Sequence, residues 1–247
     1  MTLIDLNADL GEGMPDDAAM LSVVTSCSVA CGGHAGDEAS MTETLRAARA
    51  AGVVVGAHPS YPDREHFGRR TMRMDPDDLI RSLTGQVAAL LSIAAREAVP
   101  LRHLKPHGAL YNDAARDEGL ALILARLTAD LLPGAALIGP PNSALAKAAR
   151  LVAIPFLAEG FADRAYRADG SLVPRSAPGA VIDGPDRADR AVRLATERAL
   201  PTGDGGSVSL PIQTICLHGD APGAGAAARA VRDALQAAGV TVRAPHG

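Results

Sequence analysis

Short runs of apolar residues alternate with longer amphipathic stretches along the whole chain. Apolar runs bounded by Gly, Pro or polar residues are typical of buried strands, and the longer stretches have the spacing of amphipathic helices. The strands are expected at residues 3–8, 27–30, 53–57, 101–105, 135–139, 152–157 and 214–217. Repeated strand–helix alternation predicts parallel strands joined by crossover helices. A closed barrel and a doubly wound open sheet both fit this pattern.

Capping residues mark where several helices begin and end. Residues 40–43 (Ser-Met-Thr-Glu) match a capping box, and Gly52 supplies a left-handed stop. Asp75 followed by Pro76 predicts the start of another helix. Further helices are expected at residues 118–131, 143–151, 186–199 and 225–238. Segment 201–207 is the most linker-like part of the chain, but it is short and predicts only a surface turn.

Size and composition indicate one globular domain. A chain of 247 residues with 47% hydrophobic residues can bury one sizeable core, so we expect a single domain over residues 1–247. The net charge of −4, the 2% aromatic content and the lack of Trp argue against a nucleic-acid binder. The sequence contains no apolar stretch of about 20 residues, so no membrane span is predicted. Three cysteines, an odd number, do not suggest a disulfide framework, and we expect a cytoplasmic protein.

Reactive polar residues stand directly after the predicted strands and are not scattered over the helices. In both parallel architectures ligands bind at the carboxyl ends of the strands, so these residues are expected to converge in space. Four of the seven histidines have this context: His34, His58, His107 and His218. Each alone could be a structural histidine with a hydrogen-bonded ring, but four at one rim favour a functional site. His66, His103 and His246 lack this context and are assigned no role.

The candidate catalytic residues are Asp9, Lys105 and His107. Lys105 ends an apolar strand, where burial could lower its pKa or keep it as a fixed positive charge facing an oxyanion. A lysine that extends to solvent at the rim is the structural alternative. Asp9, His58 and His107 could hold one divalent cation, because two imidazoles and a carboxylate suit a catalytic metal. Direct acid–base chemistry by Asp9 and a histidine is the alternative to a metal.

Other polar residues near the strand ends are candidates for substrate binding: Asn7, Glu12, His34, Asp37, His58, Glu159, Arg164 and His218. An arginine can hold a substrate carboxylate through two parallel hydrogen bonds. Arg69, Arg70, Arg164 and Arg175 could each play this role, and we favour Arg164.

Several common nucleotide and hydrolase signatures are absent. The glycine-rich segment 223–228 opens a helix, but no acidic residue follows at the distance used for ribose binding. No GxxxxGK[ST] loop occurs, so a Walker-type ATP site is not expected in this chain. No GxSxG segment occurs either, which argues against a serine hydrolase.

Six segments in a fixed order carry a resemblance to a known family. They are DLNADLGEG (5–13), ACGGHAGD (30–37), GAHPSYPDREHFGRR (56–70), KPHGALYN (105–112), EGFADRAYRADGSLVPRS (159–176) and CLHGDAPGA (216–224). Together they resemble the LamB/YcsF family, which is understood as the A subunit of 5-oxoprolinase. The sequence departs from the family's pattern in a shorter loop after Gly13 and in the residues at 27–30.

The resemblance implies an α/β fold, a TIM-like seven-stranded parallel (β/α) barrel of the glycoside hydrolase/deacetylase type. It also implies a complex with 5-oxoprolinase subunits B and C that opens 5-oxoproline to L-glutamate with ATP, which is bound mainly at the partner subunits. In deacetylase relatives an Asp and two His hold a metal, and Asp9, His58 and His107 stand where such ligands are expected.

The resulting hypothesis is hydrolysis of a cyclic amide that has been phosphorylated on its carbonyl oxygen at another subunit. Asp9 or a histidine would activate water, Lys105 would stabilise negative charge, and an arginine would hold the substrate carboxylate. Two alternatives remain open from the sequence. One is a self-sufficient metal-dependent carbohydrate deacetylase-like hydrolase, and the other is a non-catalytic subunit that only binds substrate.

Overall fold

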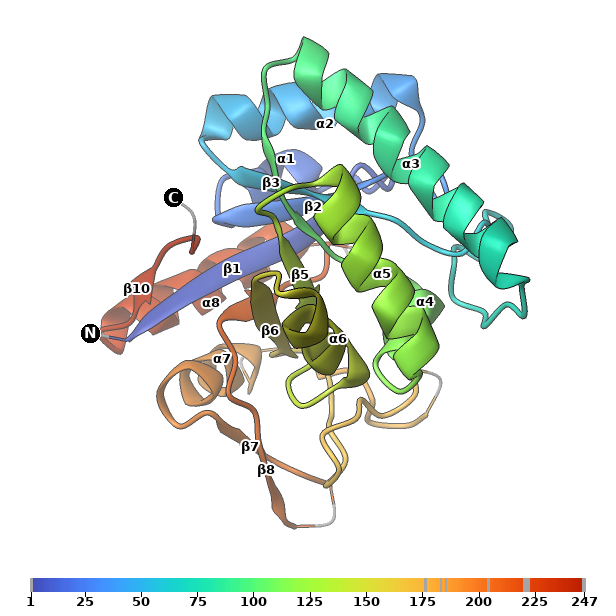
Figure 1. Cartoon of the computed structure of the whole chain (residues 1–247). Coiled ribbons are helices and arrows are strands. Elements are labelled where there is room, and N and C mark those ends of the chain that lie inside the picture. Colours follow the sequence, from blue (N-terminus) through green and yellow to red (C-terminus); the bar gives the residue numbers. More distant parts are fainter. Residues whose placement is uncertain are drawn as a thin grey trace.

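In the described part of the chain, seven parallel strands close into a barrel with helices around it (Figure 1). The computed structural model describes residues 2–175, 177–182, 184, 186–203, 205–219 and 223–245, so His246 lies outside the described residues. In order around the barrel, the strands are β1 (Leu3–Leu10), β2 (Ser26–Ala30), β3 (Val54–His58), β4 (Leu101–Leu104), β5 (Ala136–Gly139), β6 (Phe156–Phe161) and β9 (Thr214–Cys216). Because β1 pairs with both β2 and β9, the sheet is closed. The predicted parallel barrel is confirmed, and the doubly wound open sheet is excluded.

The helices surround the barrel, and most of them connect consecutive strands. They are α1 (Asp17–Leu21), α2 (Glu38–Ala51), α3 (Pro76–Arg96), α4 (Gly108–Ala114), α5 (Glu118–Leu131), α6 (Ala144–Val152), α7 (Asp186–Thr196) and α8 (Ala224–Ala237). The short strand β10 (Thr241–Val242) pairs with the beginning of β1, outside the barrel. Strands β7 (Ala199–Pro201) and β8 (Ser207–Ser209) form an antiparallel hairpin, so the predicted surface turn at 201–207 joins two strands.

Three predicted boundaries were wrong. The helix expected at 186–199 ends at Thr196, and residue 199 begins β7. The capping box of α2 is formed by Asp37 and Ser40, with Asp37 as the N-cap, and so lies three residues before the predicted one. Strand β6 begins at Phe156, because α6 continues to Val152 and ends at Ala153, which has the left-handed conformation. The helix stop at Gly52 and the helix start at Asp75 are confirmed.

Strand β1 shows why the barrel interior is polar. Ile4, Leu6, Ala8 and Leu10 alternate with Asp5, Asn7 and Asp9, so one face of the strand is apolar and the other is polar. Asp5 accepts hydrogen bonds from Thr25, Ser26 and Thr214 at 2.6–2.7 Å. Asn7 contacts Glu159 of β6, the strand on the other side of β9. The polar face therefore points inward, toward the other strands.

His103 lies in the same interior and has a structural environment. Its Nε2 is 3.1 Å from the hydroxyl oxygen of Ser28, and the residue is buried. Gly56 leaves room for the ring, because a Cβ there would lie 2.1 Å from the ring atom Cδ2.

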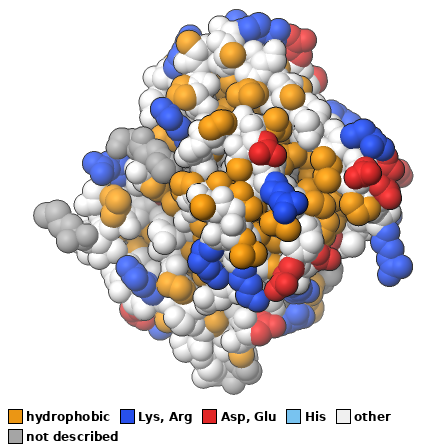
Figure 2. All heavy atoms as spheres, viewed as in Figure 1, with side chains coloured by type: hydrophobic (Ala, Val, Ile, Leu, Met, Phe, Trp, Pro, Cys, Tyr) orange, Lys and Arg blue, Asp and Glu red, His pale blue; other side chains and the backbone are white. Residues whose placement is uncertain are grey.

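The surface mixes apolar and charged side chains. On the face formed by α5 and α6, hydrophobic side chains are visible over a wide area, with basic and acidic side chains among them (Figure 2). Cys27, Cys31 and Cys216 are free and buried. Within the described ranges, we find no helix with the length and apolar character needed to cross a membrane.

Candidate active site

A cavity of about 370 Å³ opens at the carboxyl ends of the barrel strands. Asp9, His58, Lys105, His107 and His218 all line it, although they come from four different parts of the sequence. The predicted convergence of strand ends into one pocket therefore holds for these residues. Glu12 and Arg164 also line the cavity.

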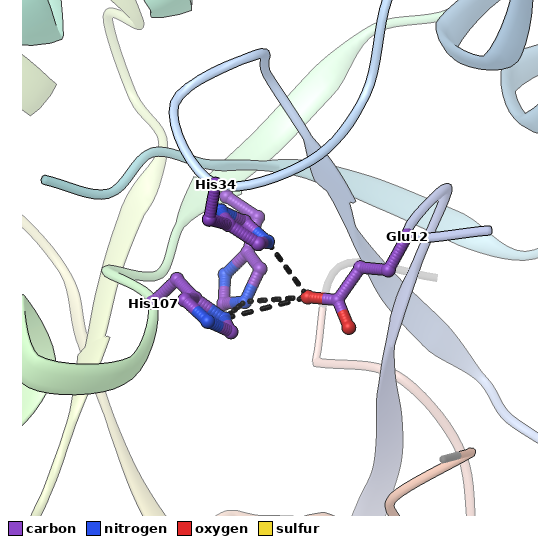
Figure 3. Close-up of side chains that lie close together, drawn as sticks. Glu12, His34 and His107 are labelled. Atoms are coloured by element: carbon purple, nitrogen blue, oxygen red, sulfur yellow. Dashed lines mark hydrogen bonds and ion pairs between the residues drawn. The ribbon is translucent and has the colours of Figure 1, made fainter. Parts of the chain in front are cut away.

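A glutamate and three histidines form one tight cluster beside the cavity, here called the Glu–His cluster: Glu12, His34, His58 and His107. The Oε1 atom of Glu12 lies 2.8 Å from Nε2 of His34, 3.4 Å from Nδ1 of His107 and 3.8 Å from Nε2 of His58. Figure 3 shows the carboxylate pointing at the His34 and His107 rings. One donor atom from each residue lies within 4.8 Å of the others.

Backbone carbonyls fix the orientation of two of these rings. Nδ1 of His58 is 2.7 Å from the carbonyl oxygen of Lys105, and Nε2 of His107 is 2.9 Å from that of Phe67. A carbonyl only accepts, so these ring nitrogens carry the hydrogens, and the tautomers follow from the hydrogen-bond partners. The other nitrogens, Nε2 of His58 and Nδ1 of His107, face each other at 3.0 Å.

The donor set of the Glu–His cluster fits a divalent cation. Imidazole nitrogens and a carboxylate oxygen are the ligands of catalytic zinc and related ions. Metal-bound histidines usually donate their second ring N–H to a carbonyl or carboxylate, as His58 and His107 do. Burial lowers the pKa of His34 to about 2 and that of His107 to about 3, which keeps both rings neutral and able to bind a cation.

This set differs from the predicted metal ligands Asp9, His58 and His107. The two histidines belong to the Glu–His cluster, but Glu12 and His34 take the place of Asp9. Asp9 pairs with Lys105, because its Oδ1 lies 3.0 Å from Nζ of Lys105, and only its Oδ2 approaches His58, at 3.3 Å. Asp9 therefore links the cluster to Lys105.

Lys105 is buried below the cavity in a network of acceptors. Its Nζ lies 2.8 Å from Oε1 of Glu159 and 3.1 Å from Oδ1 of Asn7, in addition to its ion pair with Asp9. Burial alone would lower the pKa of Lys105, but the negative charge of Asp9 and Glu159 outweighs it and holds the pKa well above the usual value. Of the three alternatives left open by the sequence, the structure favours the fixed positive charge, because Lys105 is buried and does not extend to solvent.

The pKa of Asp9 shifts in the opposite direction. Burial would raise it, but the charges of His58 and Lys105 dominate and hold it well below its usual value. Asp9 therefore stays a carboxylate throughout the physiological range of pH.

A second pair of titratable residues, Asp163 and His218, lies across the barrel from the Glu–His cluster. Nδ1 of His218 is 2.5 Å from Oδ2 of Asp163, and the His218 ring stacks on Phe161 at 5.7 Å. Asp163 was not among the predicted site residues. It lies inside the EGFADR segment, but nothing in that segment distinguishes it from a surface acid beside an arginine.

Several predicted substrate-binding residues lie away from the main cavity. Asp37 is exposed and accepts a hydrogen bond from the backbone N–H of Ser40, so its carboxylate stabilises the start of α2. Its position does not support the predicted contact with substrate. Asn7 and Glu159 are buried partners of Lys105, and the ring of His34 is bonded to Glu12.

Arg164 lines the cavity but also binds the chain that follows it. Its guanidinium donates to the carbonyl oxygens of Val173 at 2.7 Å and Ala180 at 3.3 Å. Those contacts hold the loop that contributes Arg167 and Arg175 to the cavity wall. The binding of a substrate carboxylate by Arg164 remains a prediction.

Comparisons with known proteins agree over the full length of the chain. The model of the LamB/YcsF family matches residues 4–247. A protein of Chloroflexus aggregans named as the A subunit of 5-oxoprolinase is 48% identical, and the alignment covers 100% of both chains. The crystal structure of a lactam utilization protein from Thermus thermophilus is 40% identical, with a TM-score of 0.91 over 98% of this chain and 99% of that one.

A more distant structure shares only the fold. The T48 deacetylase is 13% identical, with a TM-score of 0.52 over 98% of this chain and 87% of the deacetylase. This likeness shows that the two chains share the barrel fold. From the family match and the full-length relatives, we conclude that the chain belongs to the LamB/YcsF family.

Proposed function

We propose that this chain is the A subunit of a cytoplasmic 5-oxoprolinase and takes part in the ATP-dependent hydrolytic opening of 5-oxo-L-proline to L-glutamate. The main support is the full-length similarity to a protein that carries the name of this 5-oxoprolinase component. The site adds chemical support, because Lys105, Asp9 and the Glu–His cluster face one cavity of about 370 Å³. A fixed cation beside a carboxylate and a cluster of metal-ligand type suits attack of water on an amide carbonyl.

Each part of the site has a defined task in this proposal. Lys105 keeps its charge and stabilises negative charge that develops on the carbonyl oxygen. Asp9 or a histidine of the Glu–His cluster accepts a proton from the attacking water, and an arginine of the cavity wall holds the substrate carboxylate. A divalent cation held by Glu12, His34, His58 and His107 would supply Lewis-acid polarisation and a lowered pKa for bound water.

ATP enters this proposal through partner subunits. The sequence contains no GxxxxGK[ST] loop, which is the usual way in which a chain cradles nucleotide phosphates. We therefore place activation of the substrate by ATP on subunits B and C, and hydrolysis on this chain.

The test is glutamate release by the reconstituted complex of this chain with subunits B and C, with 5-oxoproline and with or without ATP. Asp9→Asn should reduce the rate by roughly 10²–10⁴-fold, the range typical for loss of a general base. An Asp9→Asn rate within about tenfold of wild type would exclude that role for Asp9. No dependence of glutamate release on this chain would refute the proposed function itself.

A further inference from the structure

The side of the cavity formed by β6 and β9 carries the Asp163–His218 pair. In the strand order of the barrel, β6 and β9 are neighbours and lie across from β3, which carries His58. Asp163 follows β6, and His218 follows β9. A ligand in the cavity can therefore contact the Glu–His cluster on one side and His218 on the other.

The pair has a fixed tautomer. Asp163 is buried, and its Oδ2 accepts the hydrogen from Nδ1 of His218 at 2.5 Å. Phe161 stacks on the imidazole with an angle of 20° between the ring planes, which restricts rotation of the ring. Among the residues that the structure describes, Nε2 of His218 has no hydrogen-bond partner, although His218 lines the cavity.

Breaking an amide C–N bond requires a proton for the departing nitrogen, in addition to activation of water. Lys105, His58 and His107 are poor sources of that proton. Lys105 is committed to Asp9, Glu159 and Asn7, and its raised pKa opposes proton release. In the Glu–His cluster, the N–H groups of His58 and His107 are bonded to backbone carbonyls.

We infer that His218 is the general acid that protonates the ring nitrogen as the C–N bond breaks, and that Asp163 is the residue that positions it. The inference rests on the proposed function and assigns a further catalytic residue for that reaction. Asp163 holds the proton on Nδ1, so that Nε2 presents the second proton to the cavity.

Atoms and electrons balance in this step. The carbonyl oxygen of the substrate arrives phosphorylated from the partner subunits. The oxygen of water bonds to the ring carbon and becomes its new carbonyl oxygen, with one water proton passing to Asp9 and the other to solvent. The electron pair of the C–N bond goes to the nitrogen, which takes the proton from Nε2 of His218 and becomes the free amine. The acyl phosphate that remains is cleaved by a second water to the carboxylate and inorganic phosphate, and His218 is left neutral. Proton exchange with solvent restores Asp9 and His218.

The charge of Asp163 also sets the pH range in which His218 holds this proton. Burial would lower the pKa of His218, but Asp163 outweighs burial and raises it, while Arg175 opposes and Asp9 supports the shift. Removing the charge of Asp163 should therefore lower the pKa of His218. The high-pH limb of the kcat profile would then move to lower pH.

The experiment uses the complex of this chain with subunits B and C and compares wild type, His218→Gln, Asp163→Asn and the control His66→Gln. His66 is bonded to Asp63 at 2.8 Å and does not line the cavity, so it is a matched histidine–aspartate pair. His218→Gln should lower kcat by roughly 10²–10⁴-fold, the range for loss of a general acid, with little change in KM. Asp163→Asn should shift the high-pH limb of kcat downward, and His66→Gln should match wild type.

Circular dichroism and thermal melting establish that each variant is folded. A His218→Gln rate within about tenfold of wild type overturns the assignment while leaving the proposed function intact. An unmoved high-pH limb in Asp163→Asn also overturns it. If the wild-type complex releases no glutamate from 5-oxoproline, the proposed function fails, and the role of His218 fails with it.

Discussion

Nε2 of His58 and Nδ1 of His107 face each other at 3.0 Å, while the opposite nitrogen of each ring donates to a backbone carbonyl. In these tautomers both facing atoms carry lone pairs, which repel each other unless a cation lies between them. A proton can fill this role, as can a metal ion shared with Glu12 and His34. The relationship leads to a direct test of the Glu–His cluster.

We predict that the purified chain, after dialysis against Zn²⁺ and removal of free metal, retains about one equivalent of zinc, because a structural or catalytic site holds one ion. Zinc at about 100 times its Kd should stabilise the fold by about 2.7 kcal/mol, measured as a rise in melting temperature. Glu12→Gln and His34→Ala should lower the zinc content, measured by elemental analysis. His66→Ala is the control, and equal zinc content in all four proteins would contradict the prediction.

Lys105 should be required for stability as well as chemistry. Replacing it by Met leaves the carboxylates of Asp9 and Glu159 buried without their cation. Loss of one partner from a buried ion pair typically costs about 3–5 kcal/mol, which urea unfolding of Lys105→Met should reveal. Lys147→Met is the control, because Lys147 pairs with Glu118 at an exposed surface. A Lys105→Met protein as stable as the control would show that the buried network contributes nothing.

Gly56 should tolerate no side chain. Alanine at this position would put a Cβ 2.1 Å from the His103 ring, and overpacking of a core typically costs about 1–3 kcal/mol. Gly85→Ala is the matched control, because Gly85 lies inside α3 with open space around it. Gly85→Ala should stabilise the protein by roughly 0.5–1 kcal/mol. Melting temperatures that change in the same direction for both variants would contradict this account of the barrel interior.

The Asp163–His218 pair should give stability that depends on pH. The pKa of His218 is raised in the folded protein. Its contribution to the free energy of unfolding is therefore fully present at pH below its pKa in the unfolded chain, and it is lost as pH rises through its pKa in the folded protein. The pKa of Asp163 is lowered, mainly by His218 against the opposing effect of burial. The contribution of Asp163 to the free energy of unfolding is present at pH above its pKa in the unfolded chain, and it is lost as pH falls through its pKa in the folded protein.

The difference in free energy of unfolding between wild type and Asp163→Asn should therefore be largest between about pH 4 and pH 6.5, the usual pKa values of the two groups. Urea titrations from pH 3 to pH 9 measure it. A difference that stays constant across this range would mean that the two charges do not interact.

The barrel and the location of its site could be predicted from the sequence because both depend on local patterns. Apolar runs mark the strands, and polar residues directly after them mark one rim, so His58, Lys105 and His107 were placed together correctly. These local patterns do not show that Glu12, and not Asp9, supplies the carboxylate of the Glu–His cluster. The choice depends on how far Glu12 reaches from the loop between Gly11 and Gly13, both of positive φ, and on the capture of Asp9 by Lys105.

Asp37 and Asp163 show the same limit of local sequence patterns. Asp37 was predicted to be in the site but is not, and Asp163 is in the site but was not predicted. Asp37 follows a predicted strand in a motif rich in Gly and His, yet its side chain caps a helix. Asp163 has no such distinguishing context, yet the return of the chain to β9 brings His218 to it from 55 positions away. Contacts of this range are decided by the closing of the barrel and not by any local spacing.

The pairing of β1 with β9, which closes the barrel, has a consequence for how the protein is made. The two strands are separated by about 200 residues, and Thr214 of β9 donates to Asp5 and accepts from Asn7 of β1. Pairing between such distant segments is slow and comes at a late stage, because a long loop must close first. A ribosome-bound chain that has not yet released β9 therefore leaves Asp5 and Asn7 without their contacts to Thr214. The mature site exists only after synthesis is nearly finished.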